Sequence, residues 1–588
     1  MLTYSIAAER AAIARKQRRM NAIRIFDRTC FIGCIVTFLV MMALLLAATA
    51  AHAQTVTTAR PRLLLAPADL ANLKAKAAAN SAPWRALKSA CDGYLGSIDP
   101  YDVSIPQYAL AYQVTGDTRY SSKAIQLMEA KVALGLAAVT RDSGYDARST
   151  LPALALGYDW CYDRMTIDQR SRIRAGMEAD ADWVWPETNP ARADGWAVRF
   201  PGNNYHSGFL ATWMIGLALS GDSPKAANYI TQARRRWQDE VLPYLAKYGK
   251  GGWLLDGSNY GPGSAYRWLL YLAAHKSATG EDLIQGFAWP GEWVQSKLAV
   301  TMPDMRHQLP SGDQSRVSDA TFGDLDRSSV LVALATCNLP AAITGPARTW
   351  LDTISVPVIR NRADQWQEFL FSPEDVPATP LTAAHGSSFH PSAGIVTMRS
   401  GTGWGPADTV VTFQCGARKE DHQDLAQGEI NIWRQGWLAA PARVWSSSGL
   451  YQETLYHNTL LLGTQGQVAA LYSQNHGYLA RHKSDRVAIV WKQQILLCEY
   501  LAVARGAPHR EEAMALIDYI VGPDPQSRLS RDLSYSPINV NSTVSAEMEP
   551  HMTVSHRSST DTAFDDEWWS KNVVEVQARF NAWKAARG

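Results

Sequence analysis

Two short segments of the chain combine side-chain types that can transfer protons or hold an anionic group. The first reads Gly-Asn-Asn-Tyr-His, with the amide of Asn204 followed by the imidazole of His206. The second begins at Asp256 and contains the phenols of Tyr260 and Tyr266. A phenol becomes a useful base when nearby cations or hydrogen-bond donors lower its pKa from about 10, and it can afterwards act as an acid. These residue types therefore suit general acid–base catalysis.

Each segment also has a purely structural interpretation. Asn is a favoured N-cap residue, so Asn203 or Asn204 can cap a helix that begins near Ser207. The two tyrosine rings can simply pack at the start of another helix. The sequence offers no rival motif, since it lacks a Gly-rich phosphate loop, a His-Glu-x-x-His helix and a Gly-x-Ser-x-Gly turn.

The composition excludes several broad classes of protein. The 588 residues carry 57 Lys and Arg against 55 Asp and Glu, so the formal charge of +2 gives no general electrostatic case for nucleic acid. A hydrophobic fraction of 46% excludes disorder throughout, and the length indicates several domains. The 21 Trp and 23 Tyr fit either stacking on sugar rings or core packing, because their rings are large and amphipathic.

The amino terminus has the pattern of a secretory signal. An uncharged apolar run, Phe31–Ala50, follows Arg24 and Arg28 and precedes the small-x-small sequence Ala51-His52-Ala53. We therefore predict a signal peptide over residues 1–53 and a periplasmic or secreted protein. Membrane attachment would arise only through this leader, if it stays uncleaved. The five cysteines of the mature chain are scattered and odd in number, so they do not form a disulfide framework.

The mature chain changes pattern three times, which predicts a multidomain α + β protein. Residues 54–338 read as helices joined by short Gly turns, a pattern that suits an incomplete (α/α) toroid. Residues 339–384 are rich in proline and read as a linker. Residues 385–490 contain period-two segments typical of a truncated antiparallel β-sandwich, and residues 491–588 end the chain with a short helical tail.

Four blocks in this order resemble the heparinase II/III-like polysaccharide lyases over about residues 60–463. They are Arg60-Pro-Arg-Leu-Leu-Leu-Ala-Pro-Ala-Asp-Leu, Gly202-Asn-Asn-Tyr-His, Asp256-Gly-Ser-Asn-Tyr continuing to Tyr266, and Tyr456-His-Asn-Thr. The resemblance implies a helical toroid followed by a β-sandwich. It also implies β-elimination on a uronate-containing polysaccharide of the alginate or glycosaminoglycan type, so the expected partner is an acidic polysaccharide or oligosaccharide.

The same resemblance implies a role for each candidate residue. Tyr266 matches the catalytic tyrosine, which serves as base and then as acid, and Tyr260 is the reserve. Asn204 and His206 match the residues that bind the uronate carboxylate. A gapless alignment of the segment 427–434 places His422 on the second catalytic histidine.

Zinc is where the sequence departs from the family pattern. The alignment matches His457 to a zinc ligand, but it puts Asp424 in place of a ligand histidine and Pro441 in place of a ligand aspartate. Two side chains fall short of a closed tetrahedral site. If the alignment shifts by two residues, His422 becomes the ligand instead. Zinc held by His457 and Asp424 is therefore an open alternative.

A second resemblance covers about residues 500–587. The segments Ala504-Arg-Gly-Ala-Pro-His-Arg-Glu-Glu-Ala-Met, Tyr535-Ser-Pro-Ile-Asn and Asp566-Glu-Trp-Trp resemble the carboxyl end of periplasmic spermidine/putrescine-binding proteins. Most of that two-lobed fold is missing. Two further hypotheses follow: a non-catalytic glycan-binding remnant or fusion, and a substrate-binding component of polyamine transport.

Overall fold

The structure is a computed structural model that describes most of the chain from residue 56 onward. The main described ranges are 56–96, 98–185, 206–312, 320–383, 386–401, 404–420, 422–441, 509–533, 536–546 and 548–563, with shorter pieces elsewhere. The predicted leader, residues 1–53, lies outside them. The chain divides into Met1–Thr57 and one compact unit, Thr58–Gly588, and all that follows concerns this unit. None of the described helices is long and apolar enough to cross a membrane.

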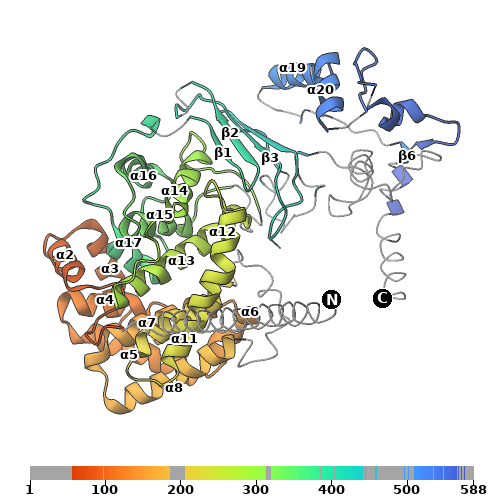
Figure 1. Cartoon of the computed structure of the whole chain (residues 1–588). Coiled ribbons are helices and arrows are strands. Elements are labelled where there is room, and N and C mark those ends of the chain that lie inside the picture. Colours follow the sequence, from red (N-terminus) through yellow and green to blue (C-terminus); the bar gives the residue numbers. More distant parts are fainter. Residues whose placement is uncertain are drawn as a thin grey trace, which may run out of the picture. The chain divides into compact units, whose positions relative to one another are not determined.

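Among the described residues as far as 371, the main elements are α-helices (Figure 1). They are α2 (Pro67–Ala78), α3 (Ala82–Gly93), α4 (Ile105–Thr115), α5 (Thr118–Ala133), α6 (Ala137–Gly144), α7 (Ala147–Trp160), α8 (Ile167–Val184), α10 (His206–Leu219), α11 (Ala226–Arg236), α12 (Leu242–Tyr248), α13 (Gly257–Thr279), α14 (Trp289–Ala299), α15 (Asp324–Thr336), α16 (Ala341–Thr353) and α17 (Gln365–Phe371). Helices α7, α10 and α13 pack together, and α13 also packs on α15.

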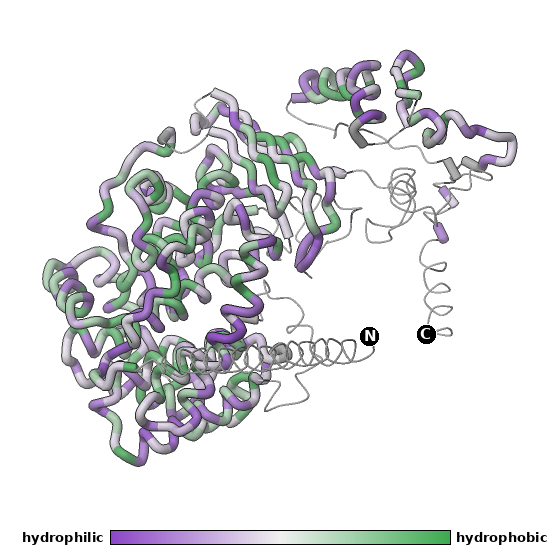
Figure 2. The backbone as a smooth tube through the Cα atoms, in the orientation of Figure 1, coloured by the Kyte–Doolittle hydropathy of each residue, from purple (hydrophilic) through white to green (hydrophobic). Residues whose placement is uncertain are grey.

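The Gly turns end helices as the sequence predicts. Gly116 after α4 and Gly280 after α13 both adopt the left-handed conformation, with φ of 74° and 78°. Glycine is suited to this position because it has no Cβ to clash with the following carbonyl. Asp117 then caps α5 by accepting the backbone N–H of Arg119. Hydrophobic residues recur between hydrophilic ones along these helices (Figure 2), whereas α13 is buried on nearly all sides.

Five antiparallel strands follow the helices in simple consecutive order. They are β1 (Ser388–His390), β2 (Ile395–Arg399), β3 (Val410–Gln414), β4 (Glu429–Trp433) and β5 (Trp437–Ala439). All five strands lie within residues 385–490, where the period-two segments predict an antiparallel sheet. One face of the sheet is buried, and it is polar where Thr412 lies opposite Asn431 and Gln414 opposite Glu429. A second sheet, which would complete a sandwich, is not among the described residues.

The described part of the carboxyl-terminal region is mainly helical. It contains α19 (Arg510–Ile520) and α20 (Pro523–Leu533), and the two-residue strands β6 (Ile495–Leu496) and β7 (Thr562–Ala563) pair in parallel. The helical tail predicted for residues 491–588 therefore contains α19 and α20. No residue of α19 is buried within the described part of the chain.

The interpretation of residues 339–384 as a linker with few helical periods needs correction. Helices α16 and α17 both lie in this segment. The prolines misled the interpretation because Pro340 occupies the N-cap of α16, where a missing N–H costs nothing.

The opening Arg60-Pro-Arg-Leu block anchors the start of the helical part. The Arg60 guanidinium forms salt bridges of 3.0 Å with Asp159 and 2.8 Å with Asp222. The buried Asp159 carboxylate also accepts the backbone N–H groups of Arg62 and Leu63. This block therefore holds the end of α7 in place and is structural.

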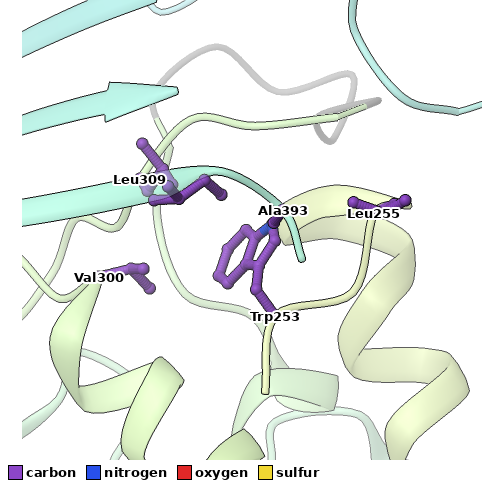
Figure 3. Close-up of a cluster of buried hydrophobic side chains, with 6 residues drawn as sticks. Trp253, Leu255, Val300, Leu309 and Ala393 are labelled. Atoms are coloured by element: carbon purple, nitrogen blue, oxygen red, sulfur yellow. The ribbon is translucent and has the colours of Figure 1, made fainter. Parts of the chain in front are cut away.

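A small hydrophobic cluster packs the helical part against the sheet (Figure 3). Trp253 and Leu255 lie just before α13, and Ala393 lies between β1 and β2. Val300 and Leu309 come from the loop after α14. These side chains are almost fully buried, so the segment leading into α13 is fixed to the sheet.

The first turn of α13 is held by close backbone contact with the loop at residues 311–312. Gly257 has φ of 80°, and a Cβ built on it would lie 2.0 Å from the Ser311 carbonyl oxygen. The Ser258 backbone N–H donates to the same oxygen at 2.6 Å, and the Ser258 hydroxyl donates to it at 2.9 Å. Only glycine fits this contact at position 257.

Two glycines at opposite ends of α13 provide a direct test. Gly280 has a similar φ, but nothing lies within 4 Å of its virtual Cβ. We expect Gly280→Ala to lower the free energy of unfolding by about 1–2 kcal/mol, the cost of a left-handed alanine. Gly257→Ala should cost about 1–3 kcal/mol more because its Cβ overlaps a backbone oxygen. Urea denaturation measures both, and equal losses would contradict the close contact.

Candidate active site

Tyr266 lines a cavity of about 710 Å³ between α7, α13, α15 and the segment leading into α17. Tyr266 lies in the third turn of α13, and the residue is only 6% exposed. No hydrogen bond joins the Tyr266 hydroxyl to any residue that the structure describes. A phenol that lines a cavity without a hydrogen-bond partner among the described residues is available to a ligand.

Two arginines line the same cavity. Arg148, near the start of α7, donates to the Tyr145 carbonyl at 2.6 Å, and its guanidinium carbon lies 2.9 Å from the centre of the Tyr145 ring. Its Nε is buried without an acceptor, and no salt bridge joins it to a carboxylate within the described ranges. Burial, together with the neighbouring charge of Arg267, lowers the pKa of Arg148 to about 9. An anionic ligand would accept a hydrogen bond from the Arg148 guanidinium and would raise its pKa.

Asp364 supplies a carboxyl group to the cavity wall. It accepts hydrogen bonds from the amides of Asn361 at 2.6 Å and Gln367 at 2.9 Å. Burial raises the pKa of Asp364 to about 6, although the charge of Arg267 opposes the increase. Near neutral pH the cavity therefore carries two guanidinium groups and one titrating carboxyl.

The protonation of Tyr266 depends on the same groups. Burial raises the pKa of Tyr266 well above its usual value, and the negative charge of Asp364 adds to the increase. Arg267 acts in the opposite direction because a cation favours the phenolate. The resting residue is thus a neutral phenol, ready to donate a proton.

The reserve tyrosine and the predicted second histidine lie together. The rings of Tyr260 and His422 stack with centroids 4.0 Å apart and an angle of 20° between planes. Tyr145 meets Tyr260 edge-on at 6.4 Å. Six residues at 100° each place Tyr260 and Tyr266 about 120° apart around α13. The structure therefore brings His422 to Tyr260 rather than to Tyr266, and Tyr145 links this stack to Arg148.

The predicted carboxylate-binding residues cannot be placed. Asn204 lies outside the described residues, and although α10 begins at His206, the side chain of His206 is also outside them. The backbone of α10 can be placed from Gly208, whose virtual Cβ lies 3.7 Å from Ala147 and 3.8 Å from the Arg148 nitrogen. The start of α10 thus adjoins the start of α7, where the Arg148 side chain enters the cavity.

The candidate zinc ligands His457 and Asp424 are close to each other. The His457 Nδ1 contacts the carboxylate of Glu429, a neighbour that the sequence analysis missed, while its Nε2 lies 3.8 Å from Asp424. Glu429 therefore occupies one ring nitrogen, and the other nitrogen faces Asp424. Within the described ranges, no group of three His, Cys, Asp or Glu residues is placed to hold a metal ion. Two ligands fall short of a closed tetrahedral site, so zinc held by His457 and Asp424 stays a prediction.

Sequence reasoning missed the arginines and Asp364 for different reasons. Arg267 directly follows Tyr266 and so was visible as a candidate cation. Arg148 and Asp364 belong to no motif, and only the packing of separate helices brings them to the cavity.

Comparison with known proteins gives no close relative. No protein-family model matches the chain. A gamma-aminobutyric acid-binding protein of Pseudomonas aeruginosa is 28% identical over 170 residues, which span 28% of this chain and 42% of that protein. The chain therefore spans less than half the length of this relative.

Solved structures with partial similarity include two lyases. The heparan sulfate lyase HepC from Pedobacter heparinus is 16% identical, with 62% of this chain and 53% of that chain covered at a TM-score of 0.37. A heparinase III is 13% identical, with coverage of 62% and 54% and a TM-score of 0.38. Similarity this low identifies neither a substrate nor a catalytic residue in this chain, which spans about half of each.

Proposed function

We propose that the chain is a polysaccharide lyase that cleaves uronate-containing chains, of the alginate or glycosaminoglycan type, by β-elimination. The observation that carries the proposal is the Tyr266 hydroxyl, which lines a 710 Å³ cavity beside Arg148 and Arg267. A cavity of this size accommodates part of an oligosaccharide. Its two guanidinium groups suit the carboxylate of a uronate or the sulfate of a glycosaminoglycan.

β-Elimination requires removal of a weakly acidic proton next to the uronate carboxylate, with negative charge developing on that group. Arg148 and Arg267 would stabilise this charge. Tyr266, a neutral phenol at rest, would first release its own proton to water, a step that the charge of Arg267 favours. The resulting phenolate would abstract the substrate proton and return it to the departing glycosidic oxygen, which regenerates the phenolate. Neutralisation of Asp364 removes one of the contributions that oppose ionisation of Tyr266.

The stacked pair of Tyr260 and His422 is the second candidate for proton transfer. It lies next to Tyr145, which contacts Arg148, so it belongs to the surroundings of the same cavity. Asn204 and His206 keep their proposed place on the substrate carboxylate, which the position of Gly208 beside Arg148 supports. A polymeric substrate outside the cytoplasm fits the proposed secretion to the periplasm or beyond.

Removal of one phenol oxygen tests the proposal. Elimination creates a double bond in the uronate, so ultraviolet absorbance follows turnover on alginate, heparan sulfate, hyaluronan and chondroitin. We expect Tyr266→Phe to lower kcat by about 100- to 10,000-fold, the usual contribution of general acid–base catalysis. Stability should change little because the hydroxyl bonds to no described residue.

The matched control removes a phenol oxygen elsewhere. Tyr229 is equally buried, but its hydroxyl donates to Asp182 at 2.7 Å, outside the cavity. Tyr229→Phe should leave kcat intact. Full turnover in Tyr266→Phe would assign the proton transfer to another group, and loss of turnover in Tyr260→Phe would then identify the stacked pair. Tight binding without product in the wild type would instead identify a non-catalytic glycan-binding protein.

The charge of Arg148 generates a separate prediction. A charge-assisted hydrogen bond contributes about 1.5–3 kcal/mol, so Arg148→Met should raise KM for an acidic polysaccharide by about 10- to 100-fold. Arg172→Met removes an arginine that is 60% exposed and paired with Glu129, and KM should stay unchanged. An unchanged KM in Arg148→Met would show that the substrate does not meet this guanidinium.

The raised pKa of Asp364 predicts how stability depends on pH. The folded state holds this proton up to about pH 6, whereas an unfolded aspartate releases it near 3.8. The stabilising contribution is therefore complete below about pH 4 and is lost as the pH rises through 6. At about 1.4 kcal/mol per tenfold change in proton affinity, the loss amounts to about 3 kcal/mol.

Urea denaturation between pH 4 and 8 measures this contribution. Asp364→Asn should show a shallower fall in the free energy of unfolding across that range than the wild type. Asp352→Asn, which alters a largely exposed carboxylate on α16, should keep the wild-type slope. A wild-type slope in Asp364→Asn would contradict the assignment.

A further inference from the structure

A second recess lies at the β4–β5 hairpin, away from the cavity that holds Tyr266. Its volume is about 470 Å³, and its lining includes Trp433 and Trp437 from the hairpin and Asp304 and His307 from the loop after α14. It shares no lining residue with the larger cavity. We call it the Trp437 recess.

The aromatic side of the Trp437 recess is preformed. Trp433 and Trp437 are partners across the hairpin, with ring centroids 5.0 Å apart and planes at 88°. His307 meets Trp437 at 83°, so neither ring that contacts Trp437 is stacked parallel on its face. Trp433 is buried, while Trp437 is only partly buried. The Trp437 indole therefore retains a flat surface for a ligand.

The polar side is fixed by a tight turn. The Asp304 carboxylate accepts the backbone N–H groups of Arg306 and His307 at 3.1 Å and lies 2.5 Å from the His307 Nδ1. The Thr301–Gln308 bridge closes this loop. Although burial acts to raise the pKa of Asp304, hydrogen bonds from His307 and Arg306 outweigh it and hold the pKa below its usual range. A carboxylate acceptor thus stays ionised beside an aromatic surface.

These features limit the ligand. A purely apolar group would remove the Asp304 charge further from water without adding a hydrogen bond to it, which is costly. A uronate or sulfated sugar would be repelled by the same charge. A single ammonium group would leave much of the 470 Å³ unfilled, and the carboxylate already has a partner in His307. A neutral sugar offers both a C–H face for the indole and hydroxyl donors for the carboxylate.

We propose that the Trp437 recess binds a neutral pyranose ring of a polysaccharide, stacked on Trp437 with a hydroxyl group donating to Asp304. This binding involves no bond cleavage, so it does not depend on the lyase chemistry. The recess would hold a neutral sugar unit of a polymer, whereas the larger cavity is proposed to take an acidic one.

Calorimetry with defined oligosaccharides tests this site. Chitohexaose and cellohexaose are suitable probes because they are neutral and contain no uronate to eliminate. We expect at least one of them to bind the wild-type protein, and Trp437→Ala to weaken that binding at least 10-fold. Trp568→Ala removes a 47% exposed tryptophan outside the recess and should leave the affinity unchanged.

A conservative variant guards against loss of folding in Trp437→Ala. Asp304→Asn can keep the turn while it removes the charge, and it should weaken binding of the neutral oligosaccharide several-fold. Absence of binding by the wild type, or binding that neither variant changes, would overturn the proposal. Heat from spermidine that depends on Trp437, with none from the sugars, would also overturn it by identifying an amine site.

Discussion

The contact between the start of α13 and the loop at residues 311–312 links the helical part to the sheet. The Ser311 carbonyl accepts two hydrogen bonds from Ser258, while the Ser311 hydroxyl donates to Gln414 of β3 at 3.1 Å. Because the backbones meet at Gly257, neither segment can move without the other. Both tyrosines of α13 depend on this contact, since it fixes the turn from which one faces the cavity and the other faces His422.

The cavity around Tyr266 stabilises charged groups less well than water does, and this accounts for the shifted pKa values of the side chains that line it. Burial lowers the pKa of Arg148, which pairs with no carboxylate of the described residues, and burial raises the pKa values of Asp364 and Tyr266. The pKa of each group is thus shifted from its usual value in the direction that favours the uncharged form, as burial requires. Perturbed groups that gather around one cavity are typical of functional sites, although structural ion pairs also perturb pKa values.

The sequence predicts local structure better than it predicts the site. Helix ends at Gly116 and Gly280 and the strands with period two follow from backbone sterics and side-chain alternation, which are local properties. The linker prediction for residues 339–384 is wrong because composition does not distinguish a proline that precedes a helix from a proline in a loop. Arg148 could not be predicted as a site residue, because only the packing of α7, α10 and α13 brings it to the cavity. Tyr266 could be found because it stands in a motif.

The free protein itself provides a physical reason for the proposed preference of the cavity for acidic sugars. Holding Arg148 partly desolvated lowers its pKa, so the empty cavity carries a free-energy cost that a bound anion offsets. A neutral sugar would displace the remaining water without supplying the missing charge, and the guanidinium would then be less stable than before binding. The proposed selection therefore depends on the lack of a carboxylate paired with Arg148 among the residues that the structure describes, and a carboxylate installed there should remove it.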